Sequence, residues 1–303
     1  MAENHKHAHD MSKIEQVLSK YNFNISDEEV AAAVKKIIDE KVPENDTDEV
    51  KRFMFGSICL TTLTTQDSAE SVLALVEKVN KFAHEYPQMP HVATIVTYPR
   101  FTKLVCDSLE VDGVIPTCVS GAFPSSQALT EIKVAETAMA IRDGAENVDI
   151  VMHVGEFLSG DYETVCEEII EQKEACGDVP MKVILETGDL RNAADIKKAS
   201  ILSMYSGADY IKTSTGKEKV SATPEAAYVM CQAIKEYYDE TGIMVGLKPA
   251  GGINTVKDAL TYYTIYKEIL GEKWLTNYYF RLGTSRLANL ILSDLEGKEV
   301  KFF

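Results

Sequence analysis

Positive charge is scarce in this sequence, and its scarcity excludes several kinds of partner. The 303 residues include 31 Lys and Arg against 47 Asp and Glu, which leaves a net charge of −16 at pH 7. A chain with this balance is soluble, and it repels nucleic acid and anionic membrane surfaces. We therefore expect neither a nucleic-acid partner nor a membrane partner. A phosphorylated ligand would need a local concentration of positive side chains.

Cysteine pairs and long apolar runs are also missing. The six cysteines are scattered without a Cys-x-x-Cys pair, so neither a zinc site nor structural disulfides are expected. No apolar run approaches the roughly 20 residues that span a bilayer. The amino-terminal residues lack the apolar stretch of a secretory signal. These absences together predict a soluble protein of the reducing cytoplasm.

The amino-terminal end divides into two predicted segments. His5, His7 and His9 alternate in a polar stretch, so residues 1–10 are predicted to be a disordered, tag-like tail without a role in function. Residues 11–54 are predicted to form a helical extension. Within it, Ser26-Asp-Glu-Glu29 is typical of a capping box, and the helix that it opens is predicted to run through Ile38. This extension either covers the bottom of the main domain or forms a subunit contact.

Residues 55–303 show short apolar runs in alternation with longer amphipathic patterns. The predicted strands cover Ser57–Leu63, Val92–Tyr98, Val114–Val119, Val148–Met152, Lys182–Glu186, Tyr210–Lys212, Met244–Lys248 and Tyr279–Leu282. The predicted helices include Glu70–His84, Leu129–Arg142, Tyr162–Ala175, Glu225–Tyr238 and Val256–Leu270. Such alternation, repeated about eight times, is typical of a parallel sheet with right-handed crossovers.

The predicted fold class is therefore α/β, with one catalytic domain built as a (β/α)8 TIM barrel. A doubly wound open sheet is the main alternative. Its dinucleotide-binding form is disfavoured, because no Gly-x-Gly-x-x-Gly follows the first strand.

Two lysines end neighbouring predicted strands. Lys212 follows the apolar pair Tyr210-Ile211, and Lys248 follows Gly246-Leu247. In a barrel the chemistry lies at the carboxyl ends of the strands. Two close ammonium groups disfavour each other's charge, so at least one pKa should fall, and a neutral amine can attack a carbonyl. The alternative reading is two independent lysines that reach the surface.

An acid interrupts the fourth apolar run. Asp149 stands between Val148 and Ile150, and a buried carboxylate needs partners. Lys248 is one candidate, and Asp149 could then move protons during Schiff-base chemistry. A structural ion pair explains Asp149 equally well. Lys182 begins the fifth strand, and a register shift of one residue would reverse the side that it faces.

Glycine-rich loops follow the last three predicted strands. Gly216-Lys217 follows the sixth strand, Gly251-Gly252 the seventh and Gly283-Thr-Ser285 the eighth. Thr255 and Asp258 resemble a capping pair at the start of the next helix. Barrels often bind phosphate after the seventh and eighth strands, on the N–H groups of a helix amino terminus. The three loops together predict a phosphate site.

A series of motifs in fixed order resembles the 2-deoxyribose-5-phosphate aldolase family over roughly residues 55 to 293. The motifs are Leu60-Thr-Thr-Leu63, Tyr98-Pro99, Val148-Asp-Ile-Val151, Lys182-Val-Ile-Leu-Glu-Thr-Gly188, Ile211-Lys-Thr-Ser-Thr-Gly-Lys217, Lys248-Pro-Ala-Gly-Gly252 and Arg281-Leu-Gly-Thr-Ser285. The pair Lys-Thr-Ser-Thr-Gly and Lys-Pro-Ala-Gly-Gly is the most specific part.

The resemblance implies a metal-independent class I aldolase, without a cofactor, that reversibly cleaves 2-deoxy-D-ribose 5-phosphate to acetaldehyde and D-glyceraldehyde 3-phosphate. It implies a Schiff base on Lys212, with Lys248 lowering its pKa and Asp149 relaying protons. It also implies a substrate contact at Lys182 near the sugar hydroxyls. The remaining implied substrate-binding residues are Thr61, Gly216, Lys217, Gly251, Gly252, Gly283, Thr284 and Ser285. Members of the family are often homodimers.

Several positions depart from the usual family pattern. Cys59 stands where Asp is common, Val96-Thr97 where Cys is common, His153 for Asn, Leu247 for Phe or Val, and Asn254 for Arg. Arg286 would compensate for Asn254, and the final Phe302-Phe303 lacks a tyrosine hydroxyl that some members carry. We expect these departures to cluster at the site. They raise the hypothesis that substrate preference has changed, by natural drift or by engineering.

Two other functions stay open at this level. One is another lysine-dependent barrel, such as a transaldolase-like or keto-acid aldolase. The other is a phosphosugar-binding barrel without catalysis, because fold does not fix function.

Overall fold

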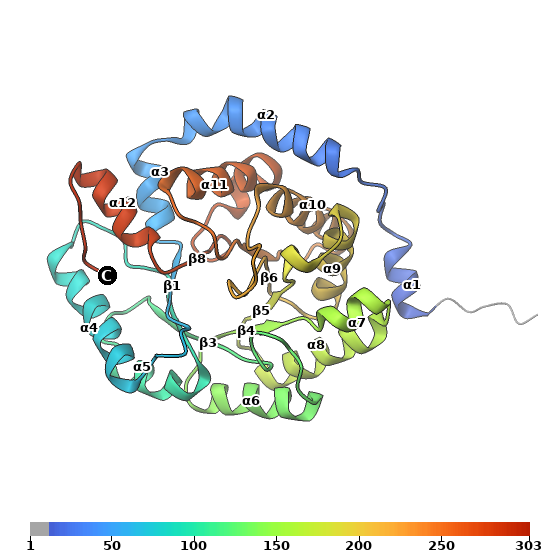
Figure 1. The fold of residues 1–303 in the computed structure, drawn as a ribbon, viewed down its shortest axis with the longest axis horizontal. Coiled ribbons are helices and arrows are strands. Elements are labelled where there is room, and N and C mark those ends of the chain that lie inside the picture. The colour runs from blue at the N-terminus through green and yellow to red at the C-terminus, as the bar shows by residue number, and fades with distance from the viewer. Residues whose placement is uncertain (1–11) are drawn as a thin grey trace, which may run out of the picture.

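The computed structural model describes residues 12–303 as a closed ring of parallel strands inside a ring of helices (Figure 1). The tail predicted over residues 1–10 lies outside the described residues. The eight strands are β1 Ile58–Thr61, β2 Thr94–Thr97, β3 Ile115–Val119, β4 Asn147–Val151, β5 Met181–Ile184, β6 Tyr210–Lys212, β7 Gly246–Lys248 and β8 Leu282–Thr284. Each neighbours the next in chain order, and β1 pairs with β8. Isolated bridges from Leu247 to Phe280 and from Ala250 to Gly283 close the ring between β7 and β8. The predicted (β/α)8 barrel is confirmed.

The last strand differs most from its prediction. β8 begins at Leu282, where the predicted strand Tyr279–Leu282 ends. The apolar run before it is a turn instead, in which the N–H groups of Tyr279 and Phe280 both donate to the carbonyl of Thr276. Within this run only Phe280 pairs with a strand, through its bridge to Leu247, and its ring is buried in the core.

The helices form the outer layer, and each helix predicted within residues 55–303 is present with both ends within three residues of the prediction. They are α4 Ala69–Glu85, α5 Thr102–Ser108, α6 Thr130–Arg142, α7 Val154–Ser159, α8 Tyr162–Cys176, α9 Ala193–Tyr205, α10 Pro224–Thr241, α11 Val256–Leu270 and α12 Leu287–Glu296. Short 3₁₀ turns lie at Pro99–Phe101, Thr187–Asp189 and Glu272–Trp274. Thr255 and Asp258 form the predicted capping box of α11, since each side chain accepts a backbone N–H of the other residue.

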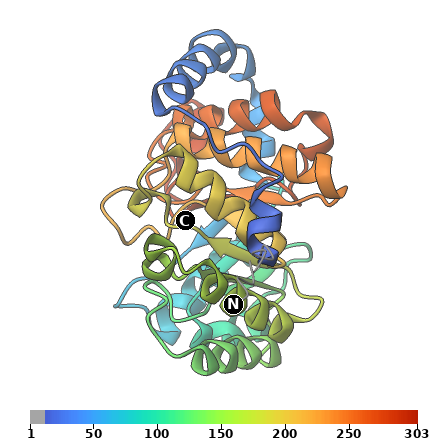
Figure 2. The same cartoon turned by 90° about the vertical axis from the view of Figure 1, so that its right-hand side faces the viewer.

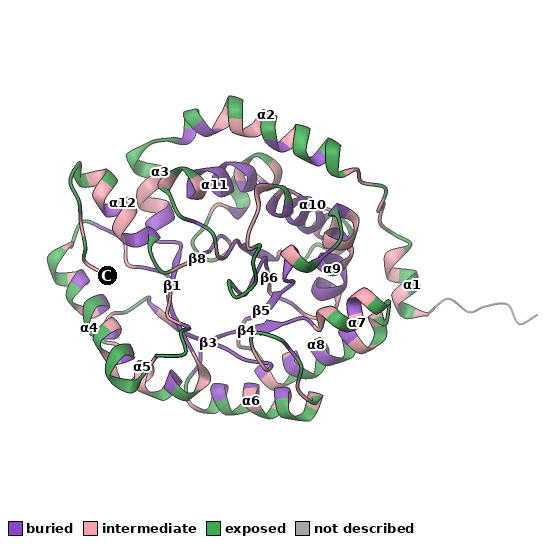
Figure 3. Ribbon diagram, in the orientation of Figure 1, coloured by how far each residue is buried: buried purple, intermediate pink, exposed green. Residues whose placement is uncertain are grey.

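Strand register decides which side chains face the inside of the barrel. Asp149 pairs with Lys182, and Lys212 pairs with both Ile184 and Lys248. Paired residues on adjacent strands point to the same face, and alternate residues along a strand share a face. The acid and all three lysines therefore point inward. The outward residues of the strands pack with the helices into one large core. Buried residues are coloured purple in Figure 3. The core includes Leu60, Ile150, Val183, Ile211 and Leu247.

The amino-terminal extension consists of α1 Lys13–Leu18, α2 Asp27–Asn45 and α3 Asp48–Phe55. α2 lies across the outer faces of α10 and α11, and α1 packs beside α9 (Figures 1 and 2). Asn45 joins the layers, since its amide donates to the Thr264 hydroxyl at 3.1 Å. Within the described residues, the extension thus thickens one side of the helical layer.

The start and end of α2 correct two details of the sequence prediction. The Ser26 hydroxyl accepts the N–H of Glu29 at 3.3 Å, as predicted, and donates to the Glu28 carboxylate. The reciprocal bond of a capping box, from the Ser26 N–H to the Glu29 carboxylate, is not among the contacts of the described residues. The helix also continues past Ile38 to Asn45. Packing against α10 and α11 supplies the stability that local sequence alone did not indicate.

Among residues 12–303, no helix is both long and apolar enough to cross a membrane.

Candidate active site

Three lysines surround one carboxylate inside the barrel. The Asp149 Oδ2 atom lies 2.9 Å from Lys212 Nζ and 2.7 Å from Lys248 Nζ. Its Oδ1 atom lies 3.3 Å from Lys182 Nζ. Asp149, Lys182 and Lys248 are fully buried, and Lys212 is 3% exposed. The strands β4, β5, β6 and β7 bring the four residues together, and Asp149 has more partners than the single one that its sequence context predicted.

Lys212 carries the most altered amine of the group. Burial and, to a lesser extent, the nearby ammonium of Lys248 lower its pKa to about 8 against the attraction of Asp149. The sequence predicted that one of the two neighbouring lysines would have a lowered pKa, and Lys212 is that lysine. About a tenth of Lys212 is neutral at pH 7, one unit below this pKa, so a nucleophilic amine is available at ordinary pH.

The other members of the group are held in their charged forms to different degrees. Burial alone would lower the pKa of Lys248, but Asp149 and the nearby Cys59 thiol raise it. Burial opposes ionisation of Asp149 too, yet the three ammonium groups hold its pKa well below the usual value. Asp149 is therefore an anion that can accept a proton from one lysine and return it to a bound intermediate.

Lys182 lies deeper than the resemblance implied. Its ammonium is 2.5 Å from Asn147 Oδ1 and lies 5.0 Å from the centre of the Tyr210 ring. Burial lowers its pKa, and Asp149 opposes that change. Lys182 does face inward, which settles the register question, but it does not line the cavity described next. Its contacts support the position of Asp149 from below.

A cavity of about 300 Å³ opens at the carboxyl ends of β1, β6, β7 and β8, and Lys212 lines it. The lining contains eight of the twelve residues that the sequence assigned to the site; Lys182, Asp149, Lys248 and Gly252 lie outside it. The lining residues are Thr61, Thr62, Leu63, Thr64, Lys212, Thr215, Gly216, Lys217, Ala250, Gly251, Gly283, Thr284 and Ser285. The mouth of the barrel is thus formed by the loops that the sequence predicted for phosphate.

At two positions in the cavity wall, neighbouring atoms lie too close to the backbone for any residue with a Cβ atom, so glycine is required. A Cβ on Gly251, whose φ is +75°, would lie 2.6 Å from Ser221 Oγ and 3.2 Å from the Cα of Gly216. A Cβ on Gly283 would lie 3.1 Å from Lys248 Cε. The first glycine lets the loops after β6 and β7 touch, and the second leaves room for the lysine side chain.

Glu186 is a site residue to which the sequence assigned no role. Its backbone is in the left-handed region at φ +53°, which is uncommon for a residue other than glycine. Its Oε1 accepts the N–H of Thr215 at 3.1 Å, and its Oε2 accepts the Thr215 hydroxyl at 2.5 Å. Glu186 therefore anchors the loop that carries Gly216 and Lys217. The acid at the end of the fifth apolar run was the available signal.

Groups of acids, histidines and cysteines suited to a metal ion are absent from residues 12–303. The strongest functional arrangement is a buried amine beside a carboxylate, at the base of a cavity with glycine-rich walls. That arrangement can form a Schiff base with a carbonyl compound and can accept or donate protons around it.

Comparison with known proteins assigns a family to this arrangement. Residues 60–265 match the model of the DeoC/LacD family aldolases. The chain belongs to the DeoC/LacD aldolase family. The human deoxyribose-phosphate aldolase is 37% identical over 252 residues, which cover 79% of this chain and 77% of the human one. A Caenorhabditis elegans protein provisionally named as a deoxyribose-phosphate aldolase is 39% identical over 275 residues, which cover 90% of each chain.

Solved structures share the fold of this chain. An aldolase named QR15 superposes with a TM-score of 0.66 at 27% identity, over 80% of this chain and 96% of that one. The deoxyribose phosphate aldolase of Aeropyrum pernix, described as tetrameric, has the same fold, with a TM-score of 0.64 at 23% identity over 86% and 97% of the two chains.

The departures from the family pattern do not cluster at the site as expected. Leu247 faces the helical layer and is buried in its core. His153 caps α7, because its Nδ1 accepts the N–H of Glu156 at 3.2 Å. Arg286 is exposed and is not among the residues that line the cavity, and its compensation for Asn254 stays a prediction. These differences lie in packing and at surfaces.

Only two of the departures lie inside this DeoC/LacD barrel. Cys59 and Val96 are fully buried and share a small cluster with Leu63 and Val119. Burial would raise the pKa of the Cys59 thiol, but the charges of Lys248, Arg281 and Lys182 together lower it. Phe303, at the chain end, lines a hollow next to the cavity, and Asn289 holds its backbone. The observed positions leave Cys59 as the departure closest to the charged group.

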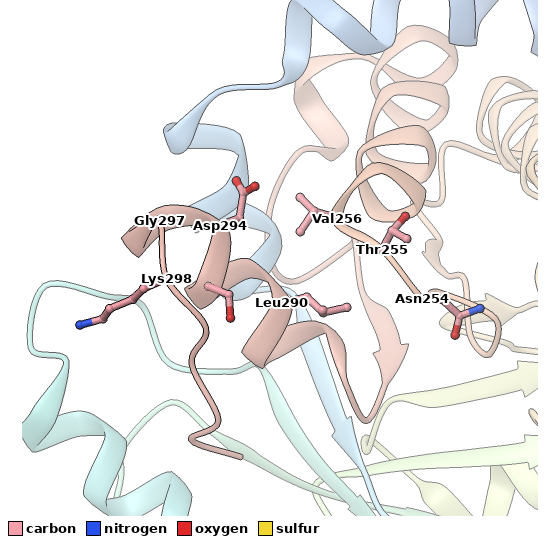
Figure 4. A pocket seen from close by; sticks show the side chains of 8 residues that line it. Asn254, Thr255, Val256, Leu290, Asp294, Gly297 and Lys298 are labelled. Carbon is pink, nitrogen blue, oxygen red and sulfur yellow. The ribbon is translucent and has the colours of Figure 1, made fainter.

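Asn254 lines a different hollow, between the start of α11 and the outer end of α12 (Figure 4). The other residues of that hollow are Thr255, Val256, Leu290, Ser293, Asp294, Gly297 and Lys298. It shares no lining residue with the lysine cavity. The contact of the Asn254 side chain is with its own loop, because its amide donates to the carbonyl of Gly252 at 3.1 Å.

Proposed function

We propose that this protein is a class I aldolase that reversibly cleaves 2-deoxy-D-ribose 5-phosphate to acetaldehyde and D-glyceraldehyde 3-phosphate. The observation that carries the proposal is Lys212: a buried amine with a pKa of about 8, 2.9 Å from a carboxylate, at the base of the cavity. The names of the family relatives supply the substrate.

The reaction begins at the aldehyde carbon of the open-chain sugar. The neutral Lys212 amine adds to it, and the resulting carbinolamine loses water to become an iminium ion. The bond between C2 and C3 then breaks as the C3 hydroxyl loses its proton. C3 becomes the aldehyde carbon of the three-carbon product, and the electron pair moves toward the iminium to form an enamine. Protonation of the enamine at C2 and addition of water release acetaldehyde and restore the amine.

Asp149 and Lys248 are the proposed proton carriers. Lys212 Nζ and Lys248 Nζ both donate to Asp149 Oδ2, at 2.9 and 2.7 Å, so a proton can pass between the two lysines through Asp149. A buried relay of this kind excludes bulk water and strengthens each electrostatic interaction. Lys182 is proposed to hold Asp149 in place. Because Lys182 is fully buried and does not line the cavity, we propose this positioning role ahead of a direct contact with the substrate.

The loops after β6, β7 and β8 are proposed to bind the substrate phosphate. Gly216, Gly251, Gly283 and Ser285 line the cavity, and the Lys217 ammonium donates to the carbonyl of Leu63 at its mouth. The amino end of α12 directly follows this lining, and the dipole of a helix favours an anion at its amino end. Gly252 shapes the turn next to the lining. We also propose a cytoplasmic location and a homodimer; light scattering on the purified protein tests the second.

Borohydride trapping tests the central step. Acetaldehyde and borohydride should add one ethyl group to the protein, and a peptide map should place it on Lys212. Lys212→Arg is the matched variant, because it keeps a cation beside Asp149 and removes the nucleophile. Labelling on Lys248 instead would exchange the proposed roles of the two lysines. A folded protein without any label would overturn the aldolase proposal and favour a barrel that only binds phosphosugars.

A further inference from the structure

A second cavity lies at the opposite end of the barrel from the lysine group. It measures about 280 Å³. Its residues precede strands β1, β2, β3 and β8, so it opens at the amino ends of the strands, whereas the lysine cavity opens at the carboxyl ends. The lining residues are Gly56, Pro90, His91, Val92, Ala93, Gly113, Asn277, Tyr278 and Arg281. No acidic side chain is among them.

Arg281 is the notable member of this lining. It is 3% exposed, and its Nε is buried without a hydrogen-bond partner. Within the part of the chain that the structure describes, no Asp or Glu forms an ion pair with it. A guanidinium remains charged in proteins, and a buried charge without a counter-ion is costly.

The charges inside the barrel explain why the chain itself does not neutralise Arg281. Lys182, Lys212 and Lys248 already share Asp149, which is the carboxylate that the described residues place among them. Positive charge thus exceeds negative charge along the barrel axis. Arg281 lines the cavity at the amino ends of the strands and not the lysine cavity, so a counter-ion in the amino-end cavity would contact it.

His91 offers a second polar atom in the same cavity. Its Nδ1 is buried and has no hydrogen-bond partner in the described residues. The Asn277 amide is already used, since it donates to the carbonyl of Gly56 at 2.9 Å. The Tyr278 ring is half-exposed on the rim, which marks the side open to solvent. Two unpartnered nitrogen sites and no acid define a site with a preference for anions.

We propose that this cavity binds a small oxyanion through Arg281, with the His91 ring as the second contact. The planar guanidinium presents paired N–H groups that match the two oxygens of a carboxylate, sulfate or phosphate group. The volume accommodates such an ion with part of its hydration shell. The site is separate from the proposed phosphate loops and does not depend on the proposed aldolase reaction.

Crystals soaked in selenate locate the ion, because selenium scatters anomalously. We expect one anomalous peak beside Arg281 and His91. A second peak at the loops around Gly251 and Ser285 would serve as an internal reference for oxyanion binding. Absence of a peak beside Arg281 in the wild-type crystal overturns the proposal.

Two variants extend the test to solution, where sulfate binding is followed by calorimetry. His91→Glu places a carboxylate in the cavity as an internal counter-ion. The affinity of this cavity for sulfate should therefore fall by at least about tenfold. Arg281→Gln should do the same if it folds. Arg142→Gln is the matched control, since Arg142 is exposed and paired with Asp143. Retained affinity in His91→Glu, or a crystal peak without binding in solution, would mean an adventitious ion only and would overturn the proposal.

Discussion

Lys212 Nζ and Asp149 Oδ2 lie 2.9 Å apart inside the barrel, although 63 positions separate the two residues in the chain. Two opposing effects act on the pKa of the Lys212 amine. The carboxylate favours the ammonium form, whereas burial and the Lys248 charge favour the neutral form, and the second pair of effects is the larger. The resulting pKa of about 8 leads to predictions about pH, charge and loop geometry.

Schiff-base formation should increase with pH up to about 8. Below this pKa the neutral fraction of Lys212 rises about tenfold per pH unit, and above it the amine is mostly neutral. The measurement is the rate of borohydride trapping with acetaldehyde between pH 6 and about 9.5. A rate that is flat over this range would contradict a titrating amine.

Lys248→Met should shift this pH profile to higher pH. The substitution removes a like charge next to Lys212, so the pKa of Lys212 should rise and less neutral amine should be present at pH 7. The turnover of the sugar phosphate should fall by about 10²- to 10⁴-fold, because a proton carrier is lost as well. Lys103→Met, at an exposed pair with Asp107, is the control. An unchanged profile would exclude electrostatic coupling of the two lysines.

Asp149→Asn should lower both activity and stability. It leaves three buried ammonium groups without a counter-ion, and breaking a buried ion pair of this kind costs about 3–5 kcal/mol. The pKa of Lys212 should fall further, so trapping by acetaldehyde at pH 7 should remain while sugar cleavage is lost. Asp294→Asn removes a partner of Lys51 at the surface and should change the free energy of unfolding by less than about 1 kcal/mol.

Glu186→Ala should weaken substrate binding more than Schiff-base chemistry. The variant frees the N–H and hydroxyl of Thr215, and the loop with Gly216 and Lys217 loses its anchor. We expect KM for the sugar phosphate to rise about tenfold, with trapping by acetaldehyde retained, since acetaldehyde has no phosphate. Equal losses in both measurements would show that Glu186 supports the whole site and not this loop.

Gly251→Ala should test the contact between the loops after β6 and β7. A methyl group there would lie 2.6 Å from Ser221 Oγ, so the loops must separate, and the preference for phosphorylated over unphosphorylated 2-deoxyribose should fall. Gly242→Ala is a close control, because its φ is +73° but its added methyl would contact nothing within 4 Å. Similar effects of the two substitutions would indicate backbone strain alone, which costs about 1 kcal/mol.

The local sequence determined the fold and singled out the candidate reactive residues. Apolar runs of strand length, capped helices and glycines after strands predicted the barrel, because backbone preferences and burial act over a few neighbouring residues. Lys212, Lys248 and Asp149 stood out for the same local reason, since each is a charged residue within or at the end of an apolar run. The family resemblance then added the reaction.

The tertiary structure decided which of these residues meet, and in which charge state. Asp149 finds Lys248 across 99 positions and also holds Lys182, whose direction follows from strand register and not from its neighbours in sequence. The anchor from Glu186 to Thr215 and the lack of a counter-ion at Arg281 exist only once the ring of strands closes. Distances and desolvation set the pKa of a side chain, and both depend on segments that are remote in sequence until the chain has folded.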